Sequence, residues 1–309
     1  MSPLESVALI GHGEVGAMLA RDLQAAGVST IRAFDLKFLD KRGKLTDEAH
    51  ALSPATACIS AAEAVADAEL IFSAVTAAQT VEAAKSVLGA IRAGAFFVDL
   101  NSASPGARRA AAAAIDGAGG RYVEAAVMSA IAPRGIKSPI LLGGPHAADF
   151  VAFAAPFGLA ARVYSPEIGR ASAAKLCRSV LVKGLEALLT ESLMAARYHG
   201  VERDVIESLT DMLPLPDWEK TASYMIGRSV QHGRRRGEEM REAAVTVAEA
   251  GIVPLLSESI ARRQDLTSTL LPASASAGAK RPLLDLLDLL LDARDAVDAD
   301  PIPAHNHHR

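Results

Sequence analysis

The sequence predicts an α/β domain followed by an all-α domain. In the first half of the chain, short apolar runs alternate with helix-like stretches, which is typical of a parallel sheet covered by helices. After Tyr164-Ser165-Pro166 the strand-like runs disappear and only helix-like segments follow. We therefore expect an α/β domain over 1–166 and a helical domain over 167–297. The remaining tail, 298–309, has nothing to pack with and is predicted to be disordered.

The predicted elements follow one another along the chain in this order. Six apolar runs predict the strands of the sheet, at 7–10, 30–34, 70–75, 96–100, 122–127 and 140–142. Ser104-Pro105 places a capping hydroxyl before a proline at a first helical position, so a helix is expected to start there. Segments separated by Pro, Gly or Ser predict the later helices, at 168–198, 203–212, 217–232, 235–250, 255–271 and 281–297.

Composition excludes several classes of partner. A chain of 309 residues is long enough for two domains, and its formal net charge of -4 gives no broad attraction to nucleic acid or to anionic membranes. The leucine-rich run 283–291 is interrupted by Asp285 and Asp288 and is too short to span a bilayer, so we interpret it as an amphipathic helix. We expect a small-molecule ligand and neither a nucleic-acid nor a membrane partner.

Cysteine content and the chain ends indicate the cellular setting. Cys58 and Cys177 allow at most one disulfide, and the N-terminus runs directly into the first strand without the pattern of a signal peptide. We therefore expect a reduced, cytoplasmic protein. The tail histidines, His305, His307 and His308, could bind a metal adventitiously, but we predict no functional metal site.

A glycine-rich segment after the first strand is the most informative motif. Gly11, Gly13 and Gly16 have GxGxxG spacing: the first allows a sharp turn, the second a close approach of backbone to pyrophosphate, and the third close packing of helix on strand. The helix that starts there directs free N–H groups at the phosphates. This is the signature of a Rossmann-type dinucleotide-binding domain, and the alternative is a glycine-rich turn that binds no phosphate. We assign cofactor binding to Gly11, His12, Gly13, Glu14, Val15, Gly16, Asp35, Lys37, Val75, Thr76 and Asn101.

Asp35 bears on the choice of cofactor. It ends the second predicted strand, where a carboxylate accepts hydrogen bonds from the adenosine ribose and repels the extra phosphate of NADP. Lys37 and Arg32 lie nearby and weaken this inference. We predict NAD, with NADP as the alternative.

A candidate catalytic lysine lies near the start of the long predicted helix. Ser179 and Lys183 follow Lys175 at i+4 and i+8, so a helix projects all three from one face. Hydride transfer must be accompanied by proton transfer, and an amine with a pKa lowered by partial burial can act as general acid or base near neutral pH. The plain structural alternative is a lysine that forms a salt bridge or extends to solvent.

The chain resembles the β-hydroxyacid dehydrogenase and 6-phosphogluconate dehydrogenase family over most of its length. The glycine loop is similar to the family's GxGxMG segment, and 124–130 is similar to its substrate-binding DAPVSGG segment. The catalytic segment of the family has a glycine, a lysine and, four residues later, an asparagine, which resembles Gly169, Lys175 and Ser179 here. The resemblance implies that Lys175 is the catalytic acid and base, assisted by Ser179, and that Ser129 and Ala130 bind substrate.

Departures from the family pattern indicate a divergent subgroup. Ser179 replaces the asparagine, so the side chain is shorter and lacks an amide donor. Ala130 and Ile131 stand where the family has two glycines with exposed amides, which adds side-chain bulk at the position that receives a carboxylate. These changes favour a differently shaped, larger and more apolar substrate.

A second polar cluster, 231–241, contains a histidine and several arginines. Guanidinium groups bind carboxylates and phosphates in bidentate fashion, and the family's helical domain, often from a partner subunit, closes over the substrate. We predict that His232 and Arg235 bind an anionic substrate, with a solvated charged face at a helix start as the alternative.

Together these observations predict an NAD(P)-dependent oxidoreductase that transfers hydride between a nicotinamide cofactor and a hydroxy acid or related alcohol. Two alternatives stay open: a reductase of an imine or aldehyde on the same scaffold, and a dinucleotide-binding sensor without catalysis. The helical domain carries more apolar side chains than one subunit can cover, so we expect a homodimer.

Overall fold

The computed structural model describes residues 6–129, 131, 134–212, 217–271 and 281–298. Contacts divide the chain into two compact units. The first unit comprises Met1–Cys177 with Glu249–Gly251, and the second comprises Arg178–Ala248 with Ile252–Arg309. The predicted disordered tail falls at 298–309, of which 299–309 lie outside the described residues.

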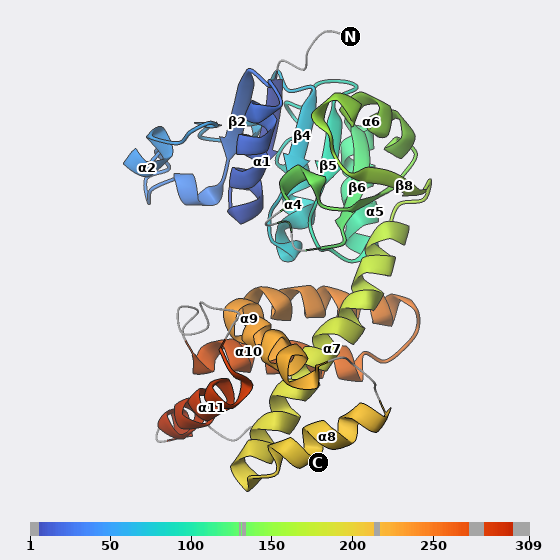
Figure 1. Cartoon of the computed structure of the whole chain (residues 1–309). Helices are drawn as coiled ribbons and strands as arrows, with labels where there is room; N and C mark the ends of the chain where they lie inside the picture. Colours follow the sequence, from blue (N-terminus) through green and yellow to red (C-terminus); the bar gives the residue numbers. More distant parts are fainter. Residues whose placement is uncertain (1–5, 130, 132–133, 213–216, 272–280, 299–309) are drawn as a thin grey trace, which may run out of the picture. The chain divides into compact units, whose positions relative to one another are not determined.

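The first unit is built on an eight-stranded sheet with the order β3-β2-β1-β4-β5-β6-β7-β8 (Figure 1). Pairing is parallel from β3 through to β6, so the carboxyl ends of these six strands lie at one edge. Their bounds are β1 Ser6–Ile10, β2 Thr30–Phe34, β3 Thr56–Ala57, β4 Leu70–Ser73, β5 Phe96–Asp99, β6 Arg121–Val127, β7 Ile140–Gly143 and β8 Ala161–Ser165.

The prediction of a parallel sheet is confirmed for the first six strands and wrong for β7. Strand β7 pairs antiparallel with β6, and β8 pairs parallel with β7. Between β6 and β7 the described residues form only the short 3-10 helix η3, Gly135–Lys137, so no crossover helix carries the chain back for parallel pairing. Strand β8 was not predicted because Arg162, Val163 and Tyr164 are all exposed and leave no apolar pattern.

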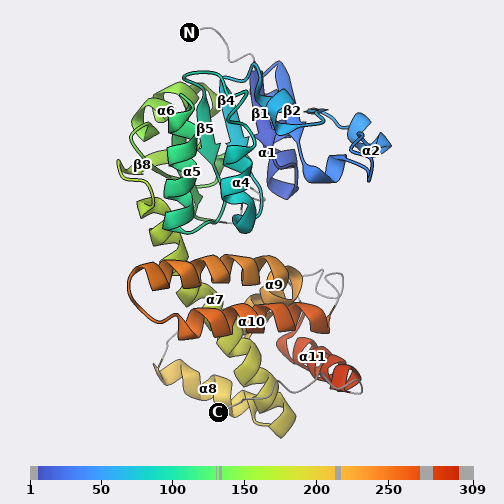
Figure 2. The same cartoon turned by 180° about the vertical axis from the view of Figure 1, so that it is seen from behind.

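Helices cover both faces of the sheet. On one face α1, Glu14–Ala25, and α6, Ala147–Ala154, pack on a core that includes Leu9, Leu23 and Phe150 (Figure 1). On the other face α3, α4 and α5 pack on a core that includes Ile71 and Ile115 (Figure 2). The remaining helices of this unit are η1 Leu36–Phe38, α2 Asp47–His50, α3 Ala61–Val65, η2 Ala77–Gln79, α4 Thr80–Lys85, α5 Pro105–Gly117 and η4 Ala155–Phe157.

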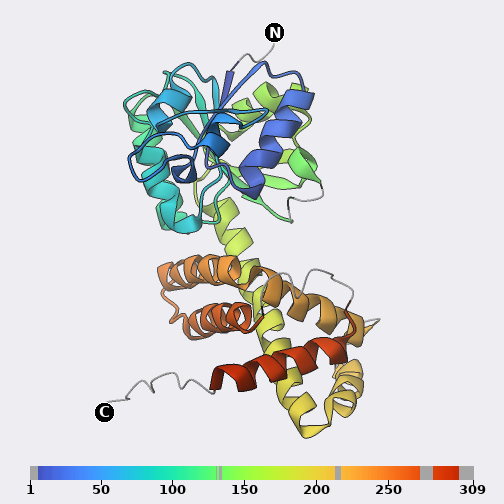
Figure 3. The ribbon, with the colours of Figure 1, turned by 90° about the vertical axis from the view of Figure 1, so that its left-hand side faces the viewer.

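All regular elements among the described residues of the second unit are helices, as predicted (Figure 3). The helices are α7 Arg170–His199, which continues from the first unit, α8 Glu202–Met212, α9 Trp218–Glu249, α10 Leu255–Leu270 and α11 Leu283–Asp298. The predicted amphipathic helix at 283–291 is confirmed as part of α11, with Leu283, Leu287 and Leu290 buried in the unit's core and Asp285 and Asp288 exposed.

The predicted break between 232 and 235 is wrong, because α9 is one helix across this region. Gly233 and Gly237 do not interrupt it. A Cβ atom on Gly233 would collide with the backbone oxygen of Gln264, and one on Gly237 with the side chain of Asp265. Both glycines therefore serve close packing of α9 against α10, where a larger residue would separate the helices.

The end of α9 belongs to the first unit. The Glu249 carboxylate accepts a hydrogen bond from Gly106 N at 3.0 Å and pairs with the Arg109 guanidinium at 3.2 Å. Gly106 lies in the first turn of α5, so Glu249 caps that helix from a distant part of the sequence.

Both cysteines are free thiols, Cys58 buried and Cys177 exposed. In the part of the chain that the structure describes, none of the helices combines the length and apolarity that crossing a membrane requires.

Candidate dinucleotide-binding and catalytic site

The glycine loop has the geometry that the spacing predicts. Gly11 has φ +93°, and a Cβ atom there would collide with the Ala74 carbonyl oxygen after β4. A Cβ atom on Gly16 would collide with the carbonyl oxygen of Gly11. Gly13 differs from both, because its Cβ position has no protein atom within 4 Å. The loop is thus tight at its first and third glycines and open at its second, which fits a cradle for pyrophosphate.

Asp35 lies beside this loop at the end of β2. Its carboxylate accepts hydrogen bonds from two backbone groups, His12 N at 2.8 Å and Lys37 N at 3.0 Å. These bonds hold the carboxylate against the glycine loop, while the Lys37 side chain is exposed. Because a carboxylate has further lone pairs, Asp35 retains the capacity to accept from ribose hydroxyls.

His12 presents a partly buried imidazole next to Asp35. Its ring centroid lies 5.7 Å from that of Phe38, and its Nε2 atom is buried with no hydrogen-bond partner among the described residues. Burial lowers the pKa of His12 in spite of the nearby Asp35 carboxylate. The imidazole is therefore neutral at neutral pH.

Contacts continue from the glycine loop along the carboxyl edge of the sheet. The Gly11 Cβ position also touches the Val75 side chain, and Val75 N donates to Asn101 Oδ1 at 2.7 Å. Asn101 Nδ2 in turn donates to Ser73 Oγ at 3.0 Å, and Asn101 is almost fully buried. Thr76 precedes η2 at the same edge. Val75 and Asn101 thus stabilise the edge beside the cofactor loop.

Lys175 reaches this same edge. Its Nζ donates a hydrogen bond to Ser102 Oγ at 2.7 Å, and Ser102 directly follows Asn101 in the loop after β5. The amine is partly buried. Sequence reasoning missed Ser102, and the only signal for it was its place one residue after Asn101, three residues beyond the end of β5.

Glu124, the first residue of the segment that resembles the family's substrate-binding motif, contacts the start of α7. Its side chain is fully buried in β6, with Oε2 accepting from Gly169 N at 2.7 Å and Oε1 accepting from Ser172 N at 2.6 Å. These are backbone N–H groups at the start of α7, so the carboxylate caps the helix that carries Lys175.

Ser179 and Lys183 lie farther along α7, in the second unit. Lys183 Nζ donates to Ser179 Oγ at 3.2 Å and pairs with the Glu239 carboxylate at 2.5 Å. Both side chains are buried. The structure therefore gives the Ser179 hydroxyl a partner on its own helix, and its proposed role in catalysis stays a prediction.

The predicted substrate residues are distributed over the chain. Ser129 is exposed and lies two residues after the end of β6, and Ala130 lies outside the described residues. His232 and Arg235 lie in the middle of α9, so the expected helix start at this charged run is wrong. The Arg235 guanidinium pairs with Glu239 at 3.0 Å and is more than half exposed. The neighbouring Arg236 is instead buried and pairs with Glu186.

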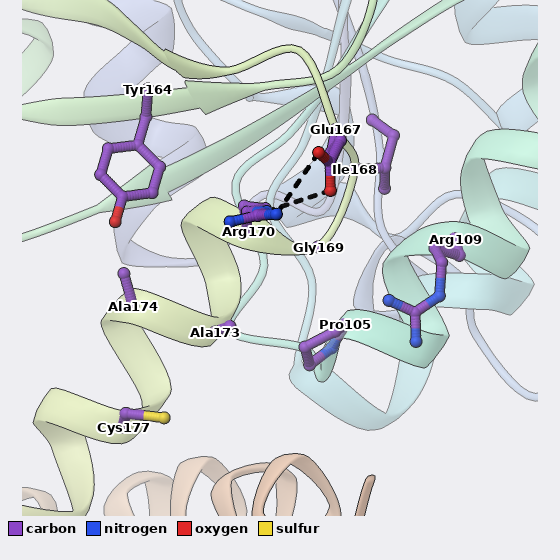
Figure 4. A pocket seen from close by; sticks show the side chains of 10 residues that line it. All are labelled: Pro105, Arg109, Tyr164, Glu167, Ile168, Gly169, Arg170, Ala173, Ala174 and Cys177. Carbon is purple, nitrogen blue, oxygen red and sulfur yellow. Dashed lines mark hydrogen bonds and ion pairs between the residues drawn. The ribbon is translucent and has the colours of Figure 1, made fainter. Parts of the chain in front are cut away.

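A cavity of about 440 Å³ lies beside the first two turns of α7 (Figure 4). Ala173, Ala174 and Cys177 line it from α7, and Pro105 and Arg109 line it from α5. None of its lining residues is a predicted site residue, and residues two apart on a helix, such as 173 and 175, point in nearly opposite directions. We assign the cavity no part in the chemistry of Lys175.

Comparison with known proteins agrees with this geometry. Residues 6–150 match the family described as the NAD binding domain of 6-phosphogluconate dehydrogenase, and residues 196–267 match a domain of unknown function. The chain belongs to the 6-phosphogluconate dehydrogenase-like family. Members of this family carry a nicotinamide-dinucleotide-binding domain, which the glycine loop and Asp35 fit.

Solved structures extend the family likeness to nearly the whole chain. A conserved hypothetical protein from Sinorhizobium meliloti 1021 is 29% identical with a TM-score of 0.74, covering 94% of this chain and 97% of that one. A conserved protein of unknown function, described as structurally similar to 3-hydroxyacid dehydrogenases, is 31% identical with a TM-score of 0.65, covering 88% and 99%. The 3-hydroxyisobutyrate dehydrogenase of Mycobacterium tuberculosis shares the fold at 19% identity and a TM-score of 0.64, covering 94% and 100%.

Proposed function

We propose that this member of the 6-phosphogluconate dehydrogenase-like family is an oxidoreductase that transfers hydride between a nicotinamide cofactor and a hydroxy acid or related alcohol, with Lys175 as general acid and base. The observation that carries the proposal is the hydrogen bond from Lys175 Nζ to Ser102 Oγ at 2.7 Å, in the loop where the neighbouring Asn101 accepts a hydrogen bond from Val75 N. This hydrogen bond supports the proposal because it holds an amine at the sheet edge at which dinucleotides bind in open α/β folds.

The residues of this site have separable tasks. A bound nicotinamide supplies the acceptor or donor of hydride. Lys175 takes the hydroxyl proton as the alcohol is oxidised and returns it in the reverse direction. Ser102 holds the amine by accepting its hydrogen bond, which restricts the directions in which the Lys175 side chain can point.

Asp35 supports NAD as the preferred cofactor. Its carboxylate is fixed against the glycine loop by two backbone donors, so it cannot swing away from an approaching 2′-phosphate without breaking them. The acidic group therefore disfavours NADP electrostatically. The assignments of Ser179, Ser129, Ala130, His232 and Arg235 to the substrate stay predictions, as do the homodimer and the cytoplasmic setting.

Replacement of Lys175 by Ala tests the proposal. We expect turnover to fall by about a hundredfold or more, because the proton has no acceptor, while the dissociation constant of the cofactor changes by less than about threefold. Lys85→Ala is the control, since Lys85 is an exposed lysine paired with Glu82 on α4. Near-normal turnover of Lys175→Ala would refute the role of the amine.

A panel of candidate substrates decides between the proposed reaction and its alternatives. Hydroxy acids, aromatic and aliphatic alcohols, aldehydes and imines are incubated with the protein, and the absorbance of the reduced nicotinamide is followed. Turnover of hydroxy acids supports the proposal. Reduction of imines or aldehydes alone assigns the alternative reductase, and tight cofactor binding without turnover of any compound assigns the sensor.

A further inference from the structure

We infer that Glu124 is a positioning residue for Lys175, and that it acts together with a buried cluster formed by Asp99, Arg108 and Tyr122. The inference rests on the proposed function, because it assigns these residues a task in holding the catalytic amine. It deepens that function by explaining which groups fix the two partners of the Lys175–Ser102 hydrogen bond.

The Glu124 carboxylate fixes the start of α7. Both oxygens of the buried Glu124 carboxylate accept backbone hydrogen bonds, from Gly169 N and Ser172 N. Charge-assisted bonds of this kind are about twice as strong as neutral ones, and the negative charge also complements the positive end of the helix. Lys175 follows Ser172 by three residues, so any shift of the capped turn moves the base of the Lys175 side chain.

The fit around Glu124 leaves its carboxylate little freedom. A Cβ atom at Gly143 in β7 would collide with Glu124 Oε2. Gly169 has φ +99°, and a Cβ atom there would lie 2.9 Å from the Arg109 guanidinium. Glycine is therefore required at both positions. Gly143 leaves room for the Glu124 carboxylate, and Gly169 adopts the turn that directs its own N–H group at that carboxylate.

Asp99 and Arg108 fix the backbone that leads into Ser102. Asp99 ends β5, and its Oδ1 accepts from Asn101 N at 2.9 Å and pairs with the Arg108 guanidinium at 2.9 Å. Arg108 also donates to the carbonyl oxygens of Asp99 and Asn101. The backbone that leads into Ser102 is thus held on both sides by one guanidinium, whose side chain has no exposed surface.

Tyr122 completes this cluster from β6. Its hydroxyl donates to Asp99 Oδ2 at 2.7 Å. Burial, reinforced by the Asp99 carboxylate, raises the pKa of Tyr122, so the hydroxyl keeps the proton that it donates. Asn101 N, the Arg108 guanidinium and the Tyr122 hydroxyl thus all bind the Asp99 carboxylate, and these bonds together restrain the turn after β5.

The two sets of contacts meet on adjacent strands. Asp99 of β5 and Glu124 of β6 are register partners, so a single cluster reaches both the loop that carries Ser102 and the helix that carries Lys175. Burial of two carboxylates and a guanidinium has a large desolvation cost, and apolar side chains would stabilise a sheet at least as well. The charged cluster instead fixes the positions of Lys175 Nζ and Ser102 Oγ, the two atoms joined by the hydrogen bond.

Glu124→Gln tests this inference while preserving side-chain shape. The amide keeps one acceptor but presents donors to the second N–H group, so the start of α7 must move. We expect kcat to fall at least about tenfold, while the cofactor dissociation constant and the substrate KM change less than about threefold. Asp116→Asn is the matched control, because Asp116 Oδ1 accepts from the backbone of the same strand, Tyr122 N, without contacting α7.

A second readout does not depend on turnover. The rate at which an amine-reactive reagent labels Lys175, measured by mass spectrometry of the folded protein, reports how firmly Ser102 holds the amine. We expect labelling to be at least about threefold faster in Glu124→Gln and unchanged in Asp116→Asn. Unchanged labelling in folded Glu124→Gln would overturn the inference, even if no substrate is found and the proposed function fails.

Tyr122→Phe provides a milder variant, in case Glu124→Gln does not fold. It removes only the hydroxyl that donates to Asp99. We expect a smaller loss of kcat and faster labelling of Lys175 than in the wild-type protein. Wild-type kcat together with wild-type labelling in Tyr122→Phe would contradict the role of the cluster.

Discussion

Substitution of single glycines in the cofactor loop separates protein stability from cofactor binding. At Gly13 the added Cβ of alanine meets no protein atom within 4 Å, and the backbone has φ -80°, which any residue adopts. The unfolding free energy of Gly13→Ala is therefore expected to stay within about 1 kcal/mol of wild type. The methyl group projects into the open side of the loop, where the pyrophosphate must approach, so cofactor affinity should fall at least about tenfold.

Gly16→Ala is expected to act on stability as well. Its Cβ would collide with the carbonyl oxygen of Gly11, a backbone atom that cannot rotate away. Overpacking of this kind costs about 1–3 kcal/mol. Urea unfolding and titration of NAD, followed by protein fluorescence or calorimetry, measure both quantities, and Gly89→Ala is the control because its Cβ also meets no atom within 4 Å. The reasoning fails if Gly13→Ala binds NAD like the wild-type protein, or if it loses as much stability as Gly16→Ala.

Two further predictions concern the neighbours of this loop. For Asp35→Ser we expect weaker NAD binding and improved turnover with NADP, because the substitution removes the carboxylate that accepts hydrogen bonds from the ribose and repels a 2′-phosphate. A preference of the wild-type protein for NADP would contradict this role of Asp35. For His12 the pKa is lowered on folding, so the unfolded state takes up the proton first and stability falls as the pH drops below about 6.5. In His12→Asn the urea midpoint should fall less between about pH 7 and about pH 5.5 than in the wild-type protein, and equal slopes would contradict the assigned burial effect.

Much of the first unit could be predicted because its elements are coded locally. The apolar runs of β1, β2, β4, β5 and β6 each coincide with an observed strand, since buried parallel strands require continuous apolar sequence. The roles of Gly11, Gly13 and Gly16 also follow from spacing alone. The sharp turn, the open cradle and the close packing each require a residue without a Cβ atom at one defined position.

Other features depend on contacts that sequence does not contain. The antiparallel direction of β7 is set by a connection without a crossover helix, and the continuity of α9 depends on the packing of Gly233 against Gln264 of α10. A glycine inside a helical pattern indicates a break when judged locally, whereas packing against a neighbouring helix gives it a different purpose.

The candidate site shows the same limit. Lys175 could be singled out from its helical spacing and the family resemblance, but its partner Ser102 lies 73 residues earlier. Glu124 begins the segment that resembles the family's substrate-binding motif, but its contacts to the start of α7 could not be predicted from that resemblance. Buried acidic residues within strands, such as Asp99 and Glu124, are the sequence signal that could have directed attention to this cluster.

Glu249 has a consequence for any attempt to dissect the chain. Because this residue supplies the acceptor for Gly106 N and the counter-charge for Arg109, a fragment that stops at Cys177 would leave the first turn of α5 without either. Such a fragment would retain every strand and the whole glycine motif, yet a helix beside the nucleotide edge would fray at its amino end. The nucleotide-binding half of this protein is therefore a discontinuous folding unit, completed only after most of the helical half has been synthesised.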